Sequence, residues 1–139
     1  MASNETIQLL WDEFINMDVK PCGLASRDIL RIEMKYCLYG NDMDETITPY
    51  ESNLGWITSL NKGDFIGKDS IIKKGDYYKL VGFKMLERGI PRKGYEILLD
   101  NKVIGKVTSG TQSPVLNCGI GLARIKSDSI FHQQKIKIA

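Results

Sequence analysis

The sequence predicts an α+β protein, in which a largely helical first part is followed by a β-rich second part. Up to about residue 74, apolar residues recur at the spacing of amphipathic helices. From Gly75 onward, short β-branched and aromatic runs alternate with Gly, Pro, Asn and Asp, a texture typical of an antiparallel sheet or barrel. At 139 residues the chain can form one domain or two small modules, and we place a boundary between residues 1–74 and 75–139.

The first predicted helix starts near residue 4, where Ser3 or Asn4 can cap it. Its apolar residues follow the 3, 4, 7 spacing of one buried stripe. The helix is expected to end before Pro21, which cannot continue it. The stripe consists of Ile7, Leu10, Trp11 and Phe14.

A second helix is predicted to begin near Ser26, whose hydroxyl suits the capping position. Asp28 would lie in its first turn, where a negative charge complements the helix dipole. Ile29 and Ile32 supply its apolar side, and Leu30 and Met34 are further candidates for that side.

A long irregular stretch, residues 40–53, follows and is rich in the Gly, Asn, Asp and Pro of turns. Loops of this length in compact domains are often functional. Residues 54–60, "LGWITSL", are predicted as a short strand, and residues 61–69 as a turn. Asp69 is the expected cap of a short helix through Ile71 and Ile72.

Five short runs in the second part are predicted as strands, and Asp100-Asn101 is suited to a two-residue hairpin turn between two of them. The glycines of "CGIGLA", residues 118–123, resemble the start of a dinucleotide-binding turn, but the third glycine and a following helix are missing. We therefore assign these glycines to a bulge or to close backbone packing. The predicted strands are residues 77–86, 95–99, 102–108, 119–125 and 135–138.

The amino-acid composition limits the kinds of partner that this chain is expected to bind. Nineteen Lys and Arg against 17 Asp and Glu leave a net charge of +2, without the basic excess of nucleic-acid-binding proteins. No apolar run reaches the roughly 18 residues needed to span a bilayer, and the N-terminus does not read as a signal peptide. The sequence therefore predicts no nucleic-acid partner, no membrane, and a cytoplasmic location.

Metal and triad chemistry are not expected. The three cysteines are odd in number and lack C-x-x-C spacing, so we interpret them as reduced and structural. The single histidine, His132, makes a His-based metal cluster or a Ser-His-Asp triad a poor prediction. A calcium loop starting at Asp42 fails because its sixth position is Ile47 and its twelfth is Asn53. We assign no catalytic residue.

Arginine is the remaining candidate for binding chemistry. Its planar fork of donors can hold a carboxylate or the polar edge of a heterocycle. Arg27, at the start of the second predicted helix, would be preorganised for this contact. The spacing alone favours a plainer interpretation, a surface ion-pair group with Asp28 and Arg31. A second basic group, Arg88, Arg92 and Lys93, lies in "ERGIPRKGYE".

The stretch "GLASRDILRIEMKYCLYGNDMDETITPYESNLGW", residues 23–56, closely resembles the "GL-x-ARD-x-LR-x-E … LYG-x-D-x-DE-x-x-x-P-x-E-x-x-L-x-W" pattern of the glycine cleavage system T-protein family. The resemblance continues through "KGDFIGKD", "RGIPRKGYEI", "IGKVTSGTQSPVL" and "IGLARI", and so runs from about Cys22 to Ile125. This family comprises the tetrahydrofolate-dependent aminomethyltransferases.

The resemblance implies an activity and a fold. The family transfers the one-carbon unit of an aminomethyl group from the lipoyl arm of the H-protein to tetrahydrofolate, with release of ammonia. Its fold surrounds a central folate cavity and ends in a small jelly-roll-like barrel. Residues 1–74 would be the latter part of the folate-binding middle region, and residues 75–139 the barrel. The cytosol, or the mitochondrial matrix in a eukaryote, is the implied location.

The resemblance also implies residue roles. Arg27, the arginine of the family's ARD motif, would contact folate. Arg88 and Arg92 would contact the folate glutamate tail or remain surface charges. Asp42 and Asp44 are interpreted as fixing the loop through backbone hydrogen bonds.

Departures from the family pattern qualify the assignment. The family's long N-terminal part, which carries an important aspartate and a pterin-holding glutamate, has no counterpart here. The family's terminal segment is also missing, so we expect a C-terminal fragment that is inactive alone. Asp64 replaces the cysteine of a related iron-sulfur branch, which favours the transferase. A non-catalytic binding module, or the tail of a dimethylglycine or sarcosine dehydrogenase, stays open as an alternative.

Overall fold

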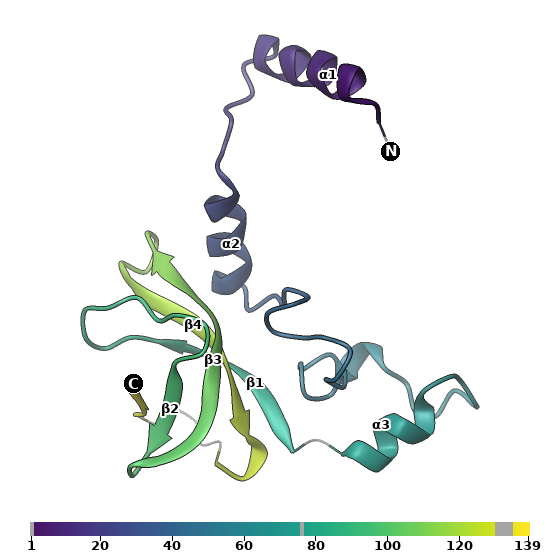
Figure 1. The fold of residues 1–139 in the computed structure, drawn as a ribbon, viewed down its shortest axis with the longest axis vertical. Coiled ribbons are helices and arrows are strands. Elements are labelled where there is room, and N and C mark those ends of the chain that lie inside the picture. Colours follow the sequence, from purple (N-terminus) through teal and green to yellow (C-terminus); the bar gives the residue numbers. More distant parts are fainter. Residues whose placement is uncertain (1, 76, 130–134) are drawn as a thin grey trace.

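A computed structural model describes residues 2–75, 77–129 and 135–139, so His132 lies outside the described residues. Within the described residues, three α-helices precede an antiparallel sheet, which confirms the predicted α+β fold (Figure 1). The helices are α1 (Asn4–Asn16), α2 (Leu24–Glu33) and α3 (Lys68–Lys74), with 3-10 turns at Gly55–Ile57 and Ser127–Ser129. The strands are β1 (Tyr78–Lys84), β2 (Glu96–Leu99), β3 (Lys102–Ser113), β4 (Cys118–Lys126) and β5 (Lys137–Ile138).

The sheet has the strand order β1-β4-β3-β2-β5 and is strongly curved (Figure 1). Each of the five predicted β runs overlaps one of these strands, but β3 and β4 extend beyond the predicted runs 102–108 and 119–125. The predicted hairpin turn is confirmed, because Leu99 pairs with Lys102 across Asp100 and Asn101. Both turn residues have positive φ, 49° and 61°, as a type I′ turn requires.

The apolar core forms two clusters. One contains Ile97, Val107 and Ala123. The other contains Ile32 of α2 together with Leu80 and Leu122 of the sheet. Helix α2 therefore packs directly on the sheet, and this contact fixes the position of everything that α2 carries.

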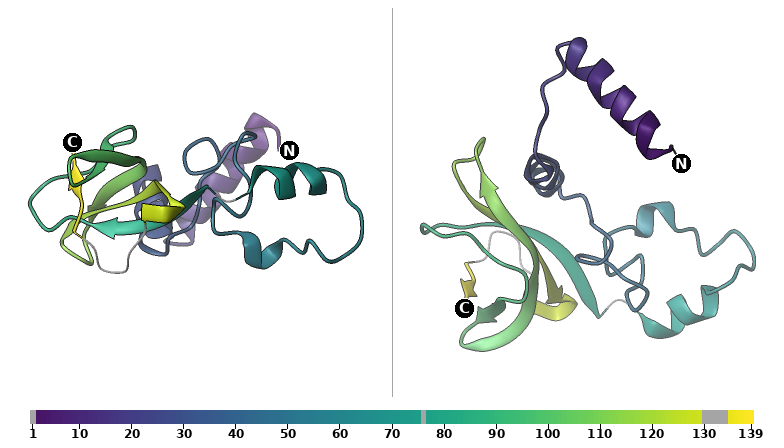
Figure 2. Two further views of the ribbon diagram at one scale, coloured as in Figure 1. Left: turned by 90° about the horizontal axis from the view of Figure 1, so that it is seen from below. Right: turned by 45° about the horizontal axis from the view of Figure 1, so that its top comes forward.

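Helix α1 confirms its predicted cap but not its predicted burial. The Ser3 hydroxyl accepts a hydrogen bond from the Thr6 N–H at 3.2 Å, and the helix ends well before Pro21. None of its described residues is buried, because no other described segment packs against it (Figures 1 and 2). The predicted stripe is about half exposed at each position: Ile7 54%, Leu10 47%, Trp11 56% and Phe14 51%. No helix among the described residues is long and apolar enough to cross a membrane.

Two predicted caps are wrong. Helix α2 begins at Leu24 after Gly23, and Ser26 lies inside its first turn, where its hydroxyl donates to the Gly23 carbonyl at 2.6 Å. Helix α3 begins at Lys68 after Gly67, so Asp69 lies within the first turn. Gly67 has a φ of 89°, a conformation that glycine adopts without the steric cost other residues incur.

The predicted strand at residues 54–60 is also wrong. The segment instead makes the 3-10 turn Gly55–Ile57. Local bonds favour this turn: the Thr58 hydroxyl donates to the Leu54 carbonyl at 3.1 Å, and the Tyr50 hydroxyl donates to the Thr58 carbonyl at 3.1 Å.

Candidate functional site

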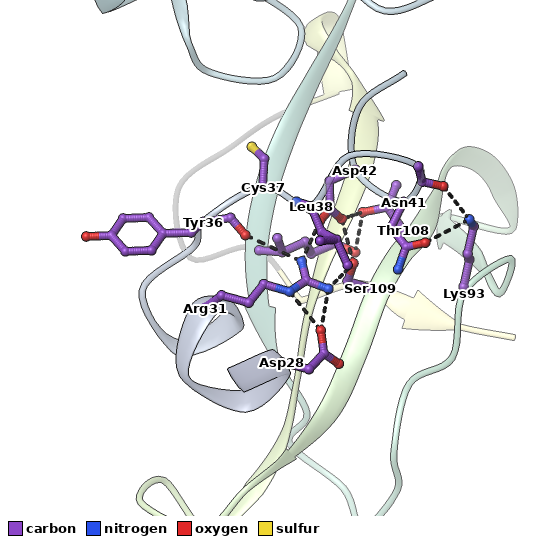
Figure 3. A network of polar contacts seen from close by, with 12 residues as sticks. Asp28, Arg31, Tyr36, Cys37, Leu38, Asn41, Asp42, Lys93, Thr108 and Ser109 are labelled. Atoms are coloured by element: carbon purple, nitrogen blue, oxygen red, sulfur yellow. Dashed lines mark hydrogen bonds and ion pairs between the residues drawn. The ribbon is translucent and has the colours of Figure 1, made fainter. Parts of the chain in front are cut away.

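Asp42, in the predicted irregular stretch, is completely buried and lies at the centre of a polar cluster (Figure 3). Its Oδ2 accepts hydrogen bonds from the Leu38 N–H at 2.9 Å and from Arg31 Nη1 at 2.5 Å. Its Oδ1 accepts from the hydroxyls of Thr108 at 2.5 Å and Ser109 at 2.7 Å. Four donors therefore compensate for the loss of water around this carboxylate.

A bulge in β3 brings the two hydroxyls to Asp42. The pairing of β3 with β4 shifts register between Val107 and Ser109, so Thr108 is the additional residue. In a regular strand, consecutive side chains point to opposite faces. The bulge interrupts this alternation, and the adjacent side chains of Thr108 and Ser109 both reach the same carboxylate oxygen.

Arg31 connects α2 to this cluster. Its side chain is only 9% exposed, and its Nε and Nη2 both approach Asp28 Oδ1, at 2.8 and 2.7 Å. Its Nη2 also donates to the Ser109 hydroxyl at 2.9 Å. The predicted Asp28–Arg31 pair is present, but Arg31 is a buried residue that also bonds to Asp42 and Ser109, and not a surface residue. Sequence spacing gave no signal for this burial, since Ser109 is 78 residues away.

The loop that holds Asp42 is attached to the sheet at further points. Arg124 of β4 donates to the Asp42 carbonyl at 2.5 Å. Lys93, between β1 and β2, donates to the Gly40 carbonyl at 2.9 Å and to Asn41 Oδ1 at 3.1 Å. The loop is therefore bonded to the barrel strands and to the segment that joins two of them.

The predicted loop-fixing role of both aspartates is confirmed. Asp44 Oδ1 accepts from the hydroxyl and the N–H of Thr46, at 2.6 and 2.8 Å. These bonds, the hydroxyl first, hold the pKa of Asp44 below its usual value. Asp42 fixes the loop through the Leu38 N–H, as described above. Within the described residues, no group of three or more His, Cys, Asp or Glu side chains could hold a metal ion.

Glu51 fixes the far end of the loop to α3. Glu51 is 3% exposed. Its carboxylate accepts a hydrogen bond from the Thr48 N–H at 2.9 Å and forms an ion pair with the Lys74 ammonium at 2.9 Å. Burial acts to raise the pKa of Glu51, but the Thr48 N–H and the Lys74 ammonium outweigh it, so the pKa is lowered.

Arg27, the predicted folate contact, is exposed on α2, one turn before Arg31. Across residues 2–75, 77–129 and 135–139, its guanidinium forms no hydrogen bond or ion pair with the protein, so its donors are available to a ligand. Arg88 and Arg92 are likewise exposed, in the segment between β1 and β2. No described contact joins them to Arg27.

The backbone that carries Arg88 and Arg92 is nevertheless held against the sheet. The Gly89 carbonyl lies directly over Gly119, and the Pro91 carbonyl over Gly110, where a Cβ atom would overlap these oxygens. The close-packing role predicted for the "CGIGLA" glycines is therefore confirmed at Gly119. Both arginines consequently project from a fixed segment.

A cavity of about 470 Å³ lies beyond the C-terminal end of α2. The exposed rings of Tyr36 and Trp56 are on its lining, and Ser52 Oγ is buried there without a hydrogen-bond partner among the described residues. The cavity offers aromatic faces on which a planar group can stack, but Arg27 does not line it.

Cys37, also on the lining of this cavity, is held as a thiol. Its thiol donates to the Ser52 carbonyl at 3.4 Å. Burial, and then the Asp42 charge, raise the pKa of Cys37, so its thiol stays protonated.

Fold and site together define a class of architecture in which a helix and a loop are fastened to a C-terminal barrel-like sheet through a buried Arg–Asp cluster. Residues 1–62 match the family model described as the GCVT N-terminal domain, and residues 79–139 match the one described as the glycine cleavage T-protein C-terminal barrel domain. The chain belongs to the glycine cleavage T-protein family.

Individual relatives agree with this assignment. An aminomethyltransferase of Clostridium botulinum (strain Okra) is 51% identical over 125 residues, which are 84% of this chain and 34% of the relative. One of Alkaliphilus oremlandii is 45% identical over 134 residues, 91% of this chain and 36% of the relative. The crystal structure of glycine cleavage system aminomethyltransferase T from Bartonella henselae matches with a TM-score of 0.85 and 26% identity, over 94% of this chain and 38% of that one.

The chain spans about a third of the length of these curated relatives. None of these similarities favours the dehydrogenase-tail or binding-module alternatives.

Proposed function

We propose that this chain forms the barrel-containing part of an aminomethyltransferase of the glycine cleavage system. In this proposal the complete enzyme receives the aminomethyl group from the lipoyl arm of the H-protein, releases ammonia and passes the one-carbon unit to tetrahydrofolate. Support comes from the family membership and from the activity for which the relatives are named. We assign no catalytic residue to this chain, and we propose that it is inactive alone.

The observation that carries the proposal is the contrast between Arg27 and Arg31. Arg31 is bound on every side by protein groups, whereas Arg27, one turn earlier on the same helix, keeps its whole donor fork unpaired within the described residues. The Arg31 cluster holds α2 against the sheet, so Arg27 is presented from a fixed base. Such a guanidinium fits the polar edge of a pterin or a carboxylate.

Folate binding of this kind accelerates transfer by placing two reactants together. The part of Arg27 in this scheme is to orient tetrahydrofolate. Arg88 and Arg92 are proposed to face the glutamate tail, because both are exposed on a backbone segment that packs on the sheet. Their contribution is expected to be smaller than that of Arg27, since exposed charge pairs are strongly screened.

The division of the chain belongs to the same proposal. Residues 1–74 would complete the folate-binding region, and residues 75–139 would form the barrel domain. The partner would be the lipoyl-carrying H-protein, and the location the cytoplasm, or the mitochondrial matrix in a eukaryote.

A chimera tests the Arg27 assignment. The matching segment of the Clostridium botulinum aminomethyltransferase is replaced by this chain, and tetrahydrofolate binding is measured by calorimetry. Removal of one charge-assisted contact costs about 1.5–3 kcal/mol, so Arg27→Ala should weaken binding by about 10- to 100-fold. Lys73→Ala, at an exposed position on α3, is the matched control. Equal affinities of the Arg27→Ala and control chimeras would refute the assignment.

A further inference from the structure

A second concave site lies on the sheet, apart from Arg27 and from the cavity beyond α2. Its volume is about 430 Å³, and its lining comes from β1, β3 and β4. Three cationic side chains, Lys106, Arg124 and Lys126, line it together with the hydroxyl-bearing residues Tyr78 and Thr108. Val103 and Ile104 provide an apolar side, and no Asp or Glu is among the lining residues that the structure describes.

Strand register concentrates these cations on one face of the sheet. Lys106 of β3 is directly opposite Arg124 of β4, and Lys126 of β4 is directly opposite Tyr78 of β1. Arg124 and Lys126 are two residues apart, so their side chains leave the strand on the same face. Like charges at directly opposed positions repel each other and destabilise a sheet unless a counter-charge is present.

The described residues supply little of that counter-charge. Within the described ranges, no carboxylate forms an ion pair with Lys106, Arg124 or Lys126. Asp44 is near enough for the Arg124 charge to help lower its pKa, but its carboxylate is bonded to Thr46.

Arg124 adds an unused donor. Its Nη2 donates to the Asp42 carbonyl, which fixes the guanidinium in place. Its Nε is buried and has no hydrogen-bond partner among the described residues. Because a buried unpaired donor is costly, a guanidinium held in this way is prepared for an acceptor that the described part of the chain does not provide.

We propose that this groove on the β1-β4-β3 face binds a small organic phosphate, with the phosphate between Lys106, Arg124 and Lys126 and a compact apolar body beside Val103 and Ile104. A phosphate matches three cations better than a carboxylate does, because it carries more charge and more acceptor oxygens. The volume exceeds that of a bare phosphate group and leaves room for an attached ring. The proposal does not depend on one-carbon transfer.

Phenyl phosphate is a suitable probe for the 139-residue chain itself. We expect saturable binding by calorimetry, with amide chemical-shift changes at residues 103–108 and 124–126. Inorganic phosphate should bind more weakly, because it lacks the ring, and phenylacetate more weakly, because it carries less charge. Benzyl alcohol, which has the ring without an anion, should cause no shifts in these residues.

Charge-removing variants locate the site. Lys106→Gln and Lys126→Gln should each weaken phenyl phosphate binding by about fivefold or more, while Lys102→Gln, exposed on the same strand and outside the lining, should leave it within about twofold. Circular dichroism confirms that each variant is folded. The proposal is overturned if binding is not detected up to about 10 mM, if phenylacetate binds more tightly, or if Lys102→Gln weakens binding as much as the groove variants.

Discussion

The Arg31 guanidinium donates to the Asp42 carboxylate across 2.5 Å, and this buried pair joins helix α2 to a loop bonded to strand β3. Both side chains are removed from water, and every carboxylate oxygen of Asp42 has two donors. Burial of a salt bridge does not by itself add stability, because desolvation offsets the attraction. The pair instead fixes the position of α2, and therefore of Arg27, relative to the sheet.

Loss of the Asp42 charge should be costly. Asp42→Asn removes the buried counter-charge of Arg31 and leaves it only the partly exposed Asp28. Removal of one partner from a buried pair costs about 3–5 kcal/mol. Urea unfolding of the variant and of the parent chain measures the difference in unfolding free energy. Asp44→Asn, an exposed acid two residues away in the same loop, should cost far less. A loss below about 1 kcal/mol in Asp42→Asn would mean that the cluster does not hold α2.

Arginine should be irreplaceable at position 31. Its fork reaches Asp28, Asp42 and Ser109 at once, and a lysine ammonium cannot reproduce that planar geometry. Arg31→Lys should therefore destabilise the chain by about 2 kcal/mol or more in the same urea assay. Stability equal to that of the parent chain would contradict the geometric argument.

Gly119 should not tolerate a side chain. A Cβ there would overlap the Gly89 carbonyl, so Gly119→Ala forces apart β4 and the segment that carries Arg88. Overpacking of this kind costs about 1–3 kcal/mol. Gly82→Ala is the matched control on β1, because its Cβ would meet only ordinary contacts from 3.8 Å outward. If both variants melt at the same temperature, the close approach is not a constraint.

Cys37 should react slowly. Burial and the nearby Asp42 charge raise its pKa, which lowers the fraction of reactive thiolate at neutral pH. We expect iodoacetamide to modify Cys37 at least about tenfold more slowly than the exposed Cys22, as followed by peptide mass spectrometry. Unfolding in urea should bring the two rates together. A fast native reaction at Cys37 would show that its thiol is open to solvent.

Glu51 should contribute a pH-dependent part of the stability. Its pKa is lowered in the folded chain, so its stabilising contribution is fully present above the unfolded value of about 4.3 and is lost as the pH falls through the folded pKa. Glu51→Gln should therefore be less stable than the parent at pH 7, with the gap narrowing below about pH 4. A gap that stays constant from pH 7 to pH 3 would contradict the Glu51–Lys74 interaction.

Local patterns were sufficient for much of the fold. Helical periodicity located α1 and α2, and β-branched runs located the strands. The Asp100-Asn101 turn was predictable because its conformation depends on the two residues themselves. The strand predicted at 54–60 failed because local bonds, such as the one from Thr58 to Leu54, favoured a 3-10 turn.

The polar cluster could not be predicted from spacing. Arg31 and Asp42 are residue types that usually lie on the surface. The hydroxyls that bond to the buried Asp42 belong to residues 66 and 67 positions further along the chain. Only the bulge in β3 places Thr108 and Ser109 side by side on that carboxylate. The exposure of α1 was also unpredictable, because an amphipathic pattern indicates an apolar face but not the surface that covers it.

The proposed role of this chain in one-carbon transfer can be measured as the rate at which the chimera with the Clostridium botulinum aminomethyltransferase converts tetrahydrofolate to methylenetetrahydrofolate, with aminomethylated H-protein as donor. We predict transfer within about tenfold of the parent enzyme, and a further fall of about 10- to 100-fold in kcat/KM on Arg27→Ala. A folded chimera that shows no transfer would rule out the proposed function of this chain. An Arg27→Ala chimera as active as the Lys73→Ala control would rule out the folate contact of Arg27.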